Sequence, residues 1–244
     1  MKISHRLLPA LACLAPLAFP VHAAELERQD VEKIVHDYLL AHPELLIDMS
    51  NALRAKQESQ QQEADVQLIK AHHDALFADK RDPVAGNEKG SVNVIVFFDY
   101  NCGYCKRATP MIDTLLHDNK KVRLVYKEFP ILSETSYIAA KAALAVNSLH
   151  PDKYSAFHAA LMAHQGALSS DKDLAVIAKK ADLNWPAIEK KMQDPTIEKQ
   201  LLETRQLAEK LGLTGTPAFV IGDQILRGAP RTTDDLKALI NDVK

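Results

Sequence analysis

Cysteine is scarce in this chain. Among 244 residues there are three, Cys13, Cys102 and Cys105. A domain built on a disulfide framework carries several well-separated cysteine pairs, so that class is excluded. A structural zinc site needs about four ligands, and neither a second close cysteine pair nor a companion histidine spacing is present. A disulfide across so short a loop would constrain the unfolded chain little, so the close pair is better explained by chemistry.

Blocks of like charge are also missing. The chain has 30 Lys and Arg against 32 Asp and Glu, a formal net charge of −2. Nothing therefore points to a nucleic-acid partner or to an anionic membrane surface. Only eight glycines occur, and none forms a glycine-rich nucleotide loop. We expect no small-molecule cofactor and no metal.

Long apolar runs are limited to one, at the N-terminus. An uncharged apolar stretch, 7–21, follows the basic residues 1–6. It falls short of the ~20 residues that a transmembrane helix needs. A lipid anchor at Cys13 is disfavoured because the apolar run continues past it. Small residues precede a cleavage point after Ala23, so the sequence predicts a removable export signal over 1–23.

The next segment, 24–80, has helical periodicity. Apolar residues recur at helical spacing over 31–39 and again over 45–53, and Pro43 between them suits the first turn of a new helix. A polar, glutamine-rich stretch follows at 54–64. These helices either pack on their own domain or form an oligomerisation arm. We favour the arm, because the polar stretch would hold it away from the rest of the chain.

An α/β pattern begins near residue 81. A β-branched and aromatic run at 92–98 predicts a buried strand, 106–117 a helix, and 122–126 a second strand. A strand, a helix and a strand in this order imply a right-handed crossover and a parallel pair.

A long helical stretch, about 133–212, then interrupts the α/β unit. The strand at 216–221, a hairpin partner at 224–227 and a final helix beginning at Thr232 or Thr233 and running through Leu239 complete it. The predicted fold class is therefore α/β, with a domain over 81–244 that is split by a helical insertion.

The pair Cys102 and Cys105 has the spacing of a redox centre. Disulfide exchange needs a thiolate to attack and a second thiol close enough to resolve the mixed disulfide. At a helix start, free N–H groups and the helix dipole would stabilise the thiolate of Cys102. We expect the Cys102 sulfur to be exposed and Cys105, one turn later, to be partly covered. Gly103 and Tyr104 lie between them and would tune the redox balance.

Two further motifs accompany the cysteines. Pro217 stands at the head of a strand, where its missing N–H does no harm. A cis bond there would turn Thr216 toward the cysteines, where it could pair with an extended client segment; an ordinary trans proline is the alternative. Lys127 and Glu128 end the second strand, and we expect a solvated strand end there rather than a proton relay.

These motifs resemble the DsbA-like thioredoxin family of bacterial envelopes. Three segments carry the resemblance: FFDYNCGYCK at 97–106, KEFPIL at 127–132 and GTPAFVIG at 215–222. It covers roughly 82–244 well and the helical arm more loosely, and it is greatest for the ScsC-type branch, which carries such an arm. The resemblance implies a thioredoxin fold and a periplasmic location.

The resemblance also implies residue roles. Cys102 is the expected nucleophile, Cys105 the resolving cysteine and Pro217 a cis proline facing them. The oxidase DsbA usually has Pro-His between its cysteines and Val before the cis proline. Here Gly103, Tyr104 and Thr216 match the isomerase DsbC instead.

We therefore expect a disulfide isomerase or reductase, with dithiol oxidation as the nearest alternative. The implied partners are exported client proteins with cysteines, a membrane redox partner, and further copies of the chain in a dimer or trimer. An isomerase must be kept reduced, and it benefits from two active sites facing a shared cleft. A holdase chaperone or a Cu(I)-binding protein that uses the thiolates is a different class that the sequence leaves open.

Overall fold

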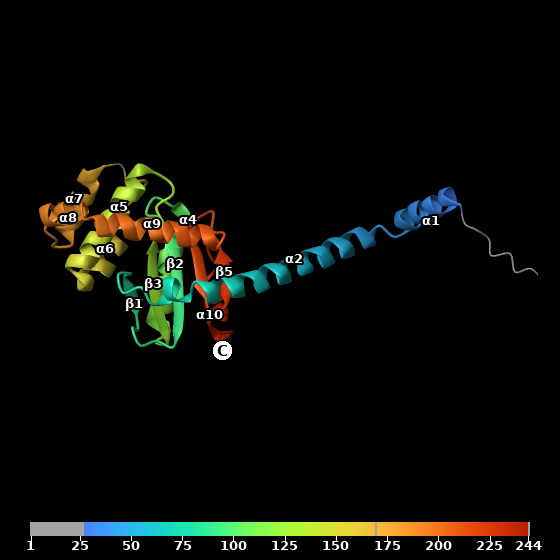
Figure 1. Ribbon diagram of the computed structural model, residues 1–244, viewed down its shortest axis with the longest axis horizontal. Helices are drawn as coiled ribbons and strands as arrows, with labels where there is room; N and C mark the ends of the chain where they lie inside the picture. The colour runs from blue at the N-terminus through green and yellow to red at the C-terminus, as the bar shows by residue number, and fades with distance from the viewer. Residues whose placement is uncertain (1–26, 169, 244) are drawn as a thin grey trace, which may run out of the picture. The chain divides into compact units, whose positions relative to one another are not determined.

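A computed structural model describes residues 27–168 and 170–243 (Figure 1). The predicted export signal over 1–23 lies outside the described residues. The chain separates into two compact units, with the division after Arg54. Within the described part, no helix is both long and apolar enough to cross a bilayer.

The helices predicted for the first segment are present. Helix α1 spans Arg28–Ala41, α2 spans Glu44–Ala71 and α3 spans His73–Phe77. Pro43 lies immediately before α2, as expected for a residue that favours a helix start. The second compact unit begins at Ala55, inside α2. The division between an arm and a catalytic domain at residues 80 and 81 stays a prediction.

The second unit contains one five-stranded sheet. Its strands are β1 (Val84–Gly86), β2 (Val92–Phe98), β3 (Val122–Glu128), β4 (Ala218–Ile221) and β5 (Gln224–Arg227), in the spatial order β1-β3-β2-β4-β5. The predicted parallel pairing of β2 with β3 is confirmed, and β4 pairs antiparallel with both β2 and β5. The sequence did not predict β1, because three residues are too few to show a strand alternation.

Helix α4 (Gly103–Asp118) joins β2 to β3, and the insertion between β3 and β4 is helical as predicted. It consists of α5 (Glu134–Leu149), α6 (Pro151–Met162), α7 (Asp171–Lys180), α8 (Trp185–Lys191) and α9 (Pro195–Lys210). Gly212 follows α9 with a φ of +65°, a left-handed conformation that glycine adopts without strain. The last helix, α10 (Thr233–Asn241), is capped by the Thr232 side chain, which accepts a hydrogen bond from the Asp235 N–H.

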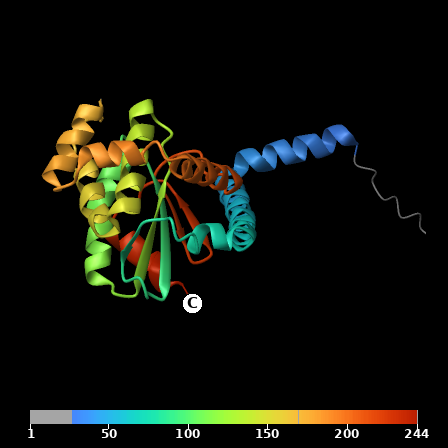
Figure 2. The ribbon, with the colours of Figure 1, turned by 60° about the vertical axis from the view of Figure 1, so that its left-hand side comes forward.

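The central strand β2 has side chains in two cores. Val94, Val96 and Phe98 belong to the core that includes α4, α10 and the helical insertion. Ile95 and Phe97, which alternate with them, belong to a second core with residues of α3 and of the end of α9. Figure 2 shows helices on both sides of the sheet. A strand buried on both faces is mostly apolar, which is why Asn93 is the one polar residue in 92–98.

Candidate redox site

Cys102 lies where strand β2 gives way to helix α4. It occupies the N-cap position of α4 in an extended backbone conformation, φ −78° and ψ 114°. Its own N–H donates to the Asp99 carbonyl at 3.1 Å. The first-turn N–H groups of α4 have no partner within the helix, so Cys102 lies at the partially positive end of the helix.

The peptide bond between Thr216 and Pro217 is cis. The Thr216 carbonyl oxygen accepts a hydrogen bond from Cys102 Sγ at 3.2 Å. The Pro217 carbonyl accepts from the Gly228 N–H at 2.9 Å, which ties the loop to the residue after β5. The structure thus brings together two motifs that lie 114 positions apart in the chain.

The expectation that the Cys102 sulfur is exposed is wrong. The residue is only 6% exposed, because the loop at Thr216 and Pro217 lies over it. Cys105 is 3% exposed, so the expectation that it is covered is confirmed. Burial raises the pKa of the Cys105 thiol well above its usual range. Cys105 is therefore a thiol at neutral pH, and it must lose a proton before it can attack a disulfide.

The two residues between the cysteines face solvent. Gly103 is exposed, and nothing lies within 4 Å of the position that a Cβ would take. Tyr104 is exposed as well, and the Arg107 guanidinium carbon lies 4.1 Å from the centroid of its ring. Both residues are placed to contact whatever approaches the cysteines.

A carboxylate that the sequence analysis did not select organises the start of α4. Asp99 is buried, and its Oδ2 accepts from the N–H groups of Ile131 and Leu132 at 2.8 and 3.0 Å. Its Oδ1 accepts from the Asn101 N–H at 2.7 Å. Asp99 thus joins the loop after β3 to the turn that carries Cys102. An aspartate directly after a buried strand is the signal that could have identified it.

Asn101 and Lys106 connect this turn to the helical insertion. The Asn101 side-chain N–H₂ donates to the hydroxyls of Ser133 and Thr135, both at 2.9 Å. Its Oδ1 accepts from the Leu168 N–H at 2.7 Å. Lys106 Nζ donates to the carbonyl groups of His164 and Gly166. Since the partners lie 32 to 67 positions away along the chain, nothing in the local sequence indicated these roles.

The prediction of a solvated strand end at Lys127 and Glu128 is wrong for both residues. Each is 3% exposed, because β3 pairs with β2 as far as Glu128 and helices cover both faces. Lys127 Nζ is bonded to the Asp82 carboxylate and donates to the Ala75 carbonyl at 2.6 Å.

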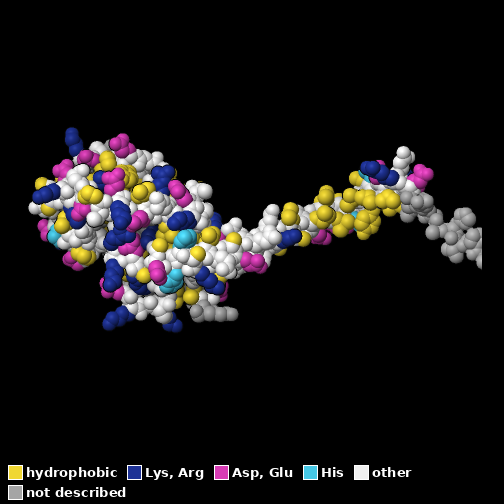
Figure 3. Space-filling view, viewed as in Figure 1, with side chains coloured by type: hydrophobic (Ala, Val, Ile, Leu, Met, Phe, Trp, Pro, Cys, Tyr) yellow, Lys and Arg dark blue, Asp and Glu magenta, His cyan; other side chains and the backbone are white. Residues whose placement is uncertain are grey.

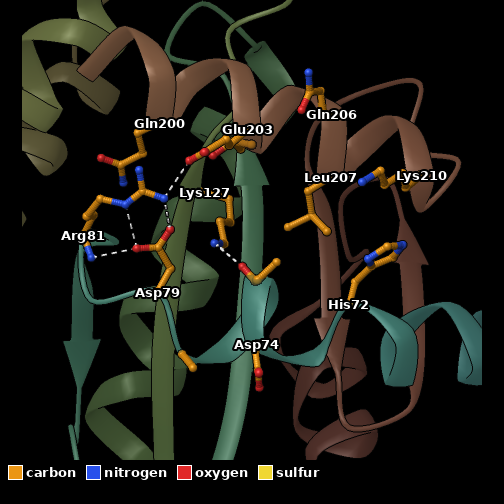
Figure 4. A pocket seen from close by; sticks show the side chains of 13 residues that line it. His72, Asp74, Asp79, Arg81, Lys127, Gln200, Glu203, Gln206, Leu207 and Lys210 are labelled. Atoms are coloured by element: carbon orange, nitrogen blue, oxygen red, sulfur yellow. Dashed lines mark hydrogen bonds and ion pairs between the residues drawn. The ribbon is translucent and has the colours of Figure 1, made fainter. Parts of the chain in front are cut away.

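Lys127 reaches a cleft between α3 and α9 (Figure 4). At the rim of this cleft the Arg81 guanidinium bridges two carboxylates, those of Asp79 and Glu203. Three of the charged groups that line the cleft are thus paired with one another, and the cysteines do not line it.

Glu128 belongs to a buried polar cluster. Its Oε1 accepts from the hydroxyls of Tyr100 and Tyr154 at 2.9 and 3.0 Å, and burial raises the pKa of the carboxyl well above its usual range. His158 Nδ1 lies 3.1 Å from the Tyr100 hydroxyl, and burial lowers the pKa of the imidazole to about 3. His158 and Cys105 line one small cavity, so this cluster borders Cys105.

Comparison with known proteins identifies both parts of the chain. Residues 93–240 match the family model of the DSBA-like thioredoxin domain. Residues 27–60 match the model of the copper resistance protein ScsC N-terminal domain.

Solved structures are also similar to this chain. A thioredoxin-like oxidoreductase from Silicibacter pomeroyi DSS-3 is 39% identical, with a TM-score of 0.66 over 69% of this chain and 95% of its own. The thiol-disulfide exchange protein alpha-DsbA2 from Wolbachia pipientis is 32% identical, with a TM-score of 0.70 over 75% and 97%. Proteus mirabilis ScsC in a transitional conformation is 32% identical, with a TM-score of 0.67 over 88% and 95%.

Among curated proteins, the match to the Na(+)/H(+) antiporter NhaA 1 of Salinispora arenicola is 29% identical over 61% of this chain. That match spans 23% of the antiporter, so the chain corresponds to about a quarter of this relative's length. The DSBA-like model covers more than half of the chain, and the ScsC N-terminal model precedes it. The chain therefore belongs to the DsbA-like thioredoxin family, in its ScsC-type branch.

Proposed function

We propose that this chain is an exported thiol:disulfide interchange protein that isomerises or reduces disulfides in cysteine-containing client proteins. The observation that carries the proposal is the Cys102 thiol at the N-cap of α4, 3.2 Å from the Thr216 carbonyl of a cis peptide bond. A client sulfur that reaches Cys102 would lie beside the exposed edge of this loop. Thr216 and Pro217 would orient the client, and Gly103 and Tyr104 would tune the redox balance.

The chemistry follows from the two cysteines. The Cys102 thiolate attacks one sulfur of a client disulfide, the client S–S bond breaks, and the other client sulfur leaves as a thiolate that takes up a proton. Isomerisation ends when a client thiolate attacks the client sulfur of this mixed disulfide and restores the Cys102 thiolate. Reduction ends when Cys105 loses its proton and attacks Cys102 Sγ, which releases the reduced client and leaves a disulfide between Cys102 and Cys105.

Burial of Cys105 favours isomerisation. Because its pKa is raised, little Cys105 thiolate is available, and the mixed disulfide has time to rearrange before the client is released. The residues Gly103, Tyr104 and Thr216, which resemble those of the isomerase DsbC, support the same conclusion. A dithiol oxidase would instead gain from fast attack by the resolving cysteine.

We further propose that the helical arm, 24–80, assembles copies of the chain into a dimer or trimer. In α1, exposed apolar side chains follow one another at intervals of four and three residues, the spacing of a coiled-coil seam: Val31, Val35 and Tyr38. In α2, the intervals are three and four residues, at the exposed side chains of Leu46, Met49 and Leu53. Figure 3 shows apolar side chains along α1 and over the first part of α2. Assembly would cover this surface and place several copies of Cys102 near one client.

Reactivation of scrambled ribonuclease tests both proposals. The mature chain should reactivate it, and Cys102→Ser should lower the rate by at least about 100-fold, since the thiolate is the nucleophile. A truncation should stop at Arg54, because Ile69 and Leu76 belong to a core of the second unit. If the truncated chain loses both reactivation and the mass of an oligomer, the result supports assembly through the arm.

Two results would count against the proposal. If neither form reactivates scrambled ribonuclease but both oxidise reduced ribonuclease, the protein is an oxidase. If the Cys102→Ser variant still rearranges disulfides, the redox proposal fails altogether. Export to the periplasm is tested separately by the N-terminal sequence of the processed protein, which should begin at Ala24.

Capture of Cu(I) is a second candidate, favoured by the match of residues 27–60 to the copper resistance protein ScsC N-terminal domain. Thiolates are preferred ligands of Cu(I), and Cys102 and Cys105 would supply two. Titration of the reduced protein with Cu(I) should then show one site that the double Ser variant lacks. Equal binding by the double variant would exclude these thiolates as the site.

A further inference from the structure

A groove lies beside the redox site and is lined by basic and apolar residues. Tyr104, Arg107 and Met111 line one wall, at positions of α4 spaced to share one helix face. Thr216, Pro230 and Arg231 contribute to the other walls. Its volume is about 650 Å³. The groove therefore combines an exposed aromatic ring, apolar surface and two guanidinium groups next to Cys102.

The groove has positive charge without negative charge among its lining residues. None of the described residues that line it is acidic, although the whole chain carries a net charge of −2. Arg107 is exposed, stacks on Tyr104, and has no ion pair with any described residue. Arg231 lies 3.5 Å from the Asp235 carboxylate, which also accepts hydrogen bonds from two backbone N–H groups. At least one positive charge in the groove is thus available to a ligand.

We propose that this groove selects client segments in which a carboxylate side chain lies two or three residues from the reacting cysteine. The inference rests on the proposed function, since it concerns the same exchange reaction. Arg107 is five positions after Cys102, about 7.5 Å along the axis of α4. An extended segment advances about 3.3 Å per residue, so two or three residues span that distance. Apolar residues next to the carboxylate would contact Met111 and Pro230.

Peptide pairs test the selection. Each peptide carries one cysteine as a disulfide with neutral thiopyridine, and either Glu or Gln two residues away. Attack by Cys102 joins its sulfur to the peptide sulfur and releases thiopyridone, which is followed by absorbance. An exposed charge pair contributes about 0.2–1 kcal/mol, so the Glu peptide should react about 1.4 to 5 times faster than the Gln peptide. The ratio should fall toward one in high salt.

Variants of the groove arginines test whether these residues cause the preference for the Glu peptide. In the double variant R107Q and R231Q the Glu to Gln ratio should fall to about one, whereas Arg107→Lys should retain most of it. Arg205→Gln serves as the matched control, because Arg205 is also exposed but lies on α9 outside the groove. Since each ratio is measured within one variant, a general loss of activity does not alter it.

Three outcomes would overturn the proposal: a ratio of one in the unaltered protein, a ratio that persists in the double variant, or a faster reaction with a Lys peptide. Dipyridyl disulfide alone provides the separate check on function. If Cys102 does not react with this neutral probe, the proposed redox function fails. If it reacts but the Glu and Gln peptides do not differ, only the groove proposal fails.

Discussion

The two compact units use the same kind of apolar pattern in different ways. In the unit that begins at Ala55, apolar residues of the sheet and helices form two buried cores. In the described part of the first unit, helix α1 has no buried residue, and large side chains such as Leu40 and Ile47 are more than 60% exposed. Periodicity thus indicates a helix face in both units, but only contacts within the chain make that face a core.

Truncation of apolar side chains should produce the largest difference in unfolding free energy between the two units. Phe219 is fully buried on β4, and Phe219→Ala should lower the free energy of unfolding by about 3–5 kcal/mol, because a cavity remains. Leu40→Ala, at a position 71% exposed, should change it by no more than about 0.5 kcal/mol. Urea unfolding followed by circular dichroism measures both. Similar losses for the two variants would contradict the comparison.

Histidines should differ between the units in their effect on pH stability. The pKa of His158 is about 3 in the folded protein, against about 6.5 when unfolded. The folded state therefore favours the neutral ring. The contribution of His158 to the free energy of unfolding is complete above the unfolded pKa, and it is lost as the pH falls from about 6.5 toward 3. Between pH 6.5 and 5 the loss should be about 1.6 kcal/mol.

The pH experiment has controls in both units. The His158→Gln variant should show a smaller fall in unfolding free energy over this pH range than the unaltered protein, whatever its stability at pH 7. His36→Gln, at an exposed position of α1, should leave the pH dependence unchanged. A fall of equal size in the His158→Gln variant would show that other groups account for it.

Ion-pair variants should show the smallest difference in unfolding free energy between the two units. Arg227 contacts both carboxylate oxygens of buried Asp65, at 2.7 and 2.8 Å. Asp65→Asn should cost about 1–3 kcal/mol, since charged hydrogen bonds are lost at a covered site. The pair of Arg28 and Glu32 in α1 is exposed, and Glu32→Gln should cost less than about 0.5 kcal/mol. Thermal unfolding of the Asp65→Asn and Glu32→Gln variants measures both losses, and a larger loss in Glu32→Gln would contradict the comparison.

Local patterns were sufficient for much of the fold. The β-branched and aromatic run at 92–98, the helix after Cys102 and the strand at 122–126 predicted the parallel β2 and β3 pair that the structure confirms. The helical insertion also agrees with its periodicity. These features depend on residues close in sequence, whose backbone preferences and spacing act locally. The short strand β1 exists only because β3 pairs with it, so no local pattern revealed it.

The environment of the site residues was decided by tertiary structure. The sequence alone determined that two cysteines stand three positions apart between a strand and a helix, and by resemblance it indicated a cis proline. That Cys102 is covered depends on Thr216, 114 positions away, and that Lys127 is buried depends on Asp82 and on helices over both faces of the sheet. Burial is a property of distant contacts, which spacing along the chain does not encode.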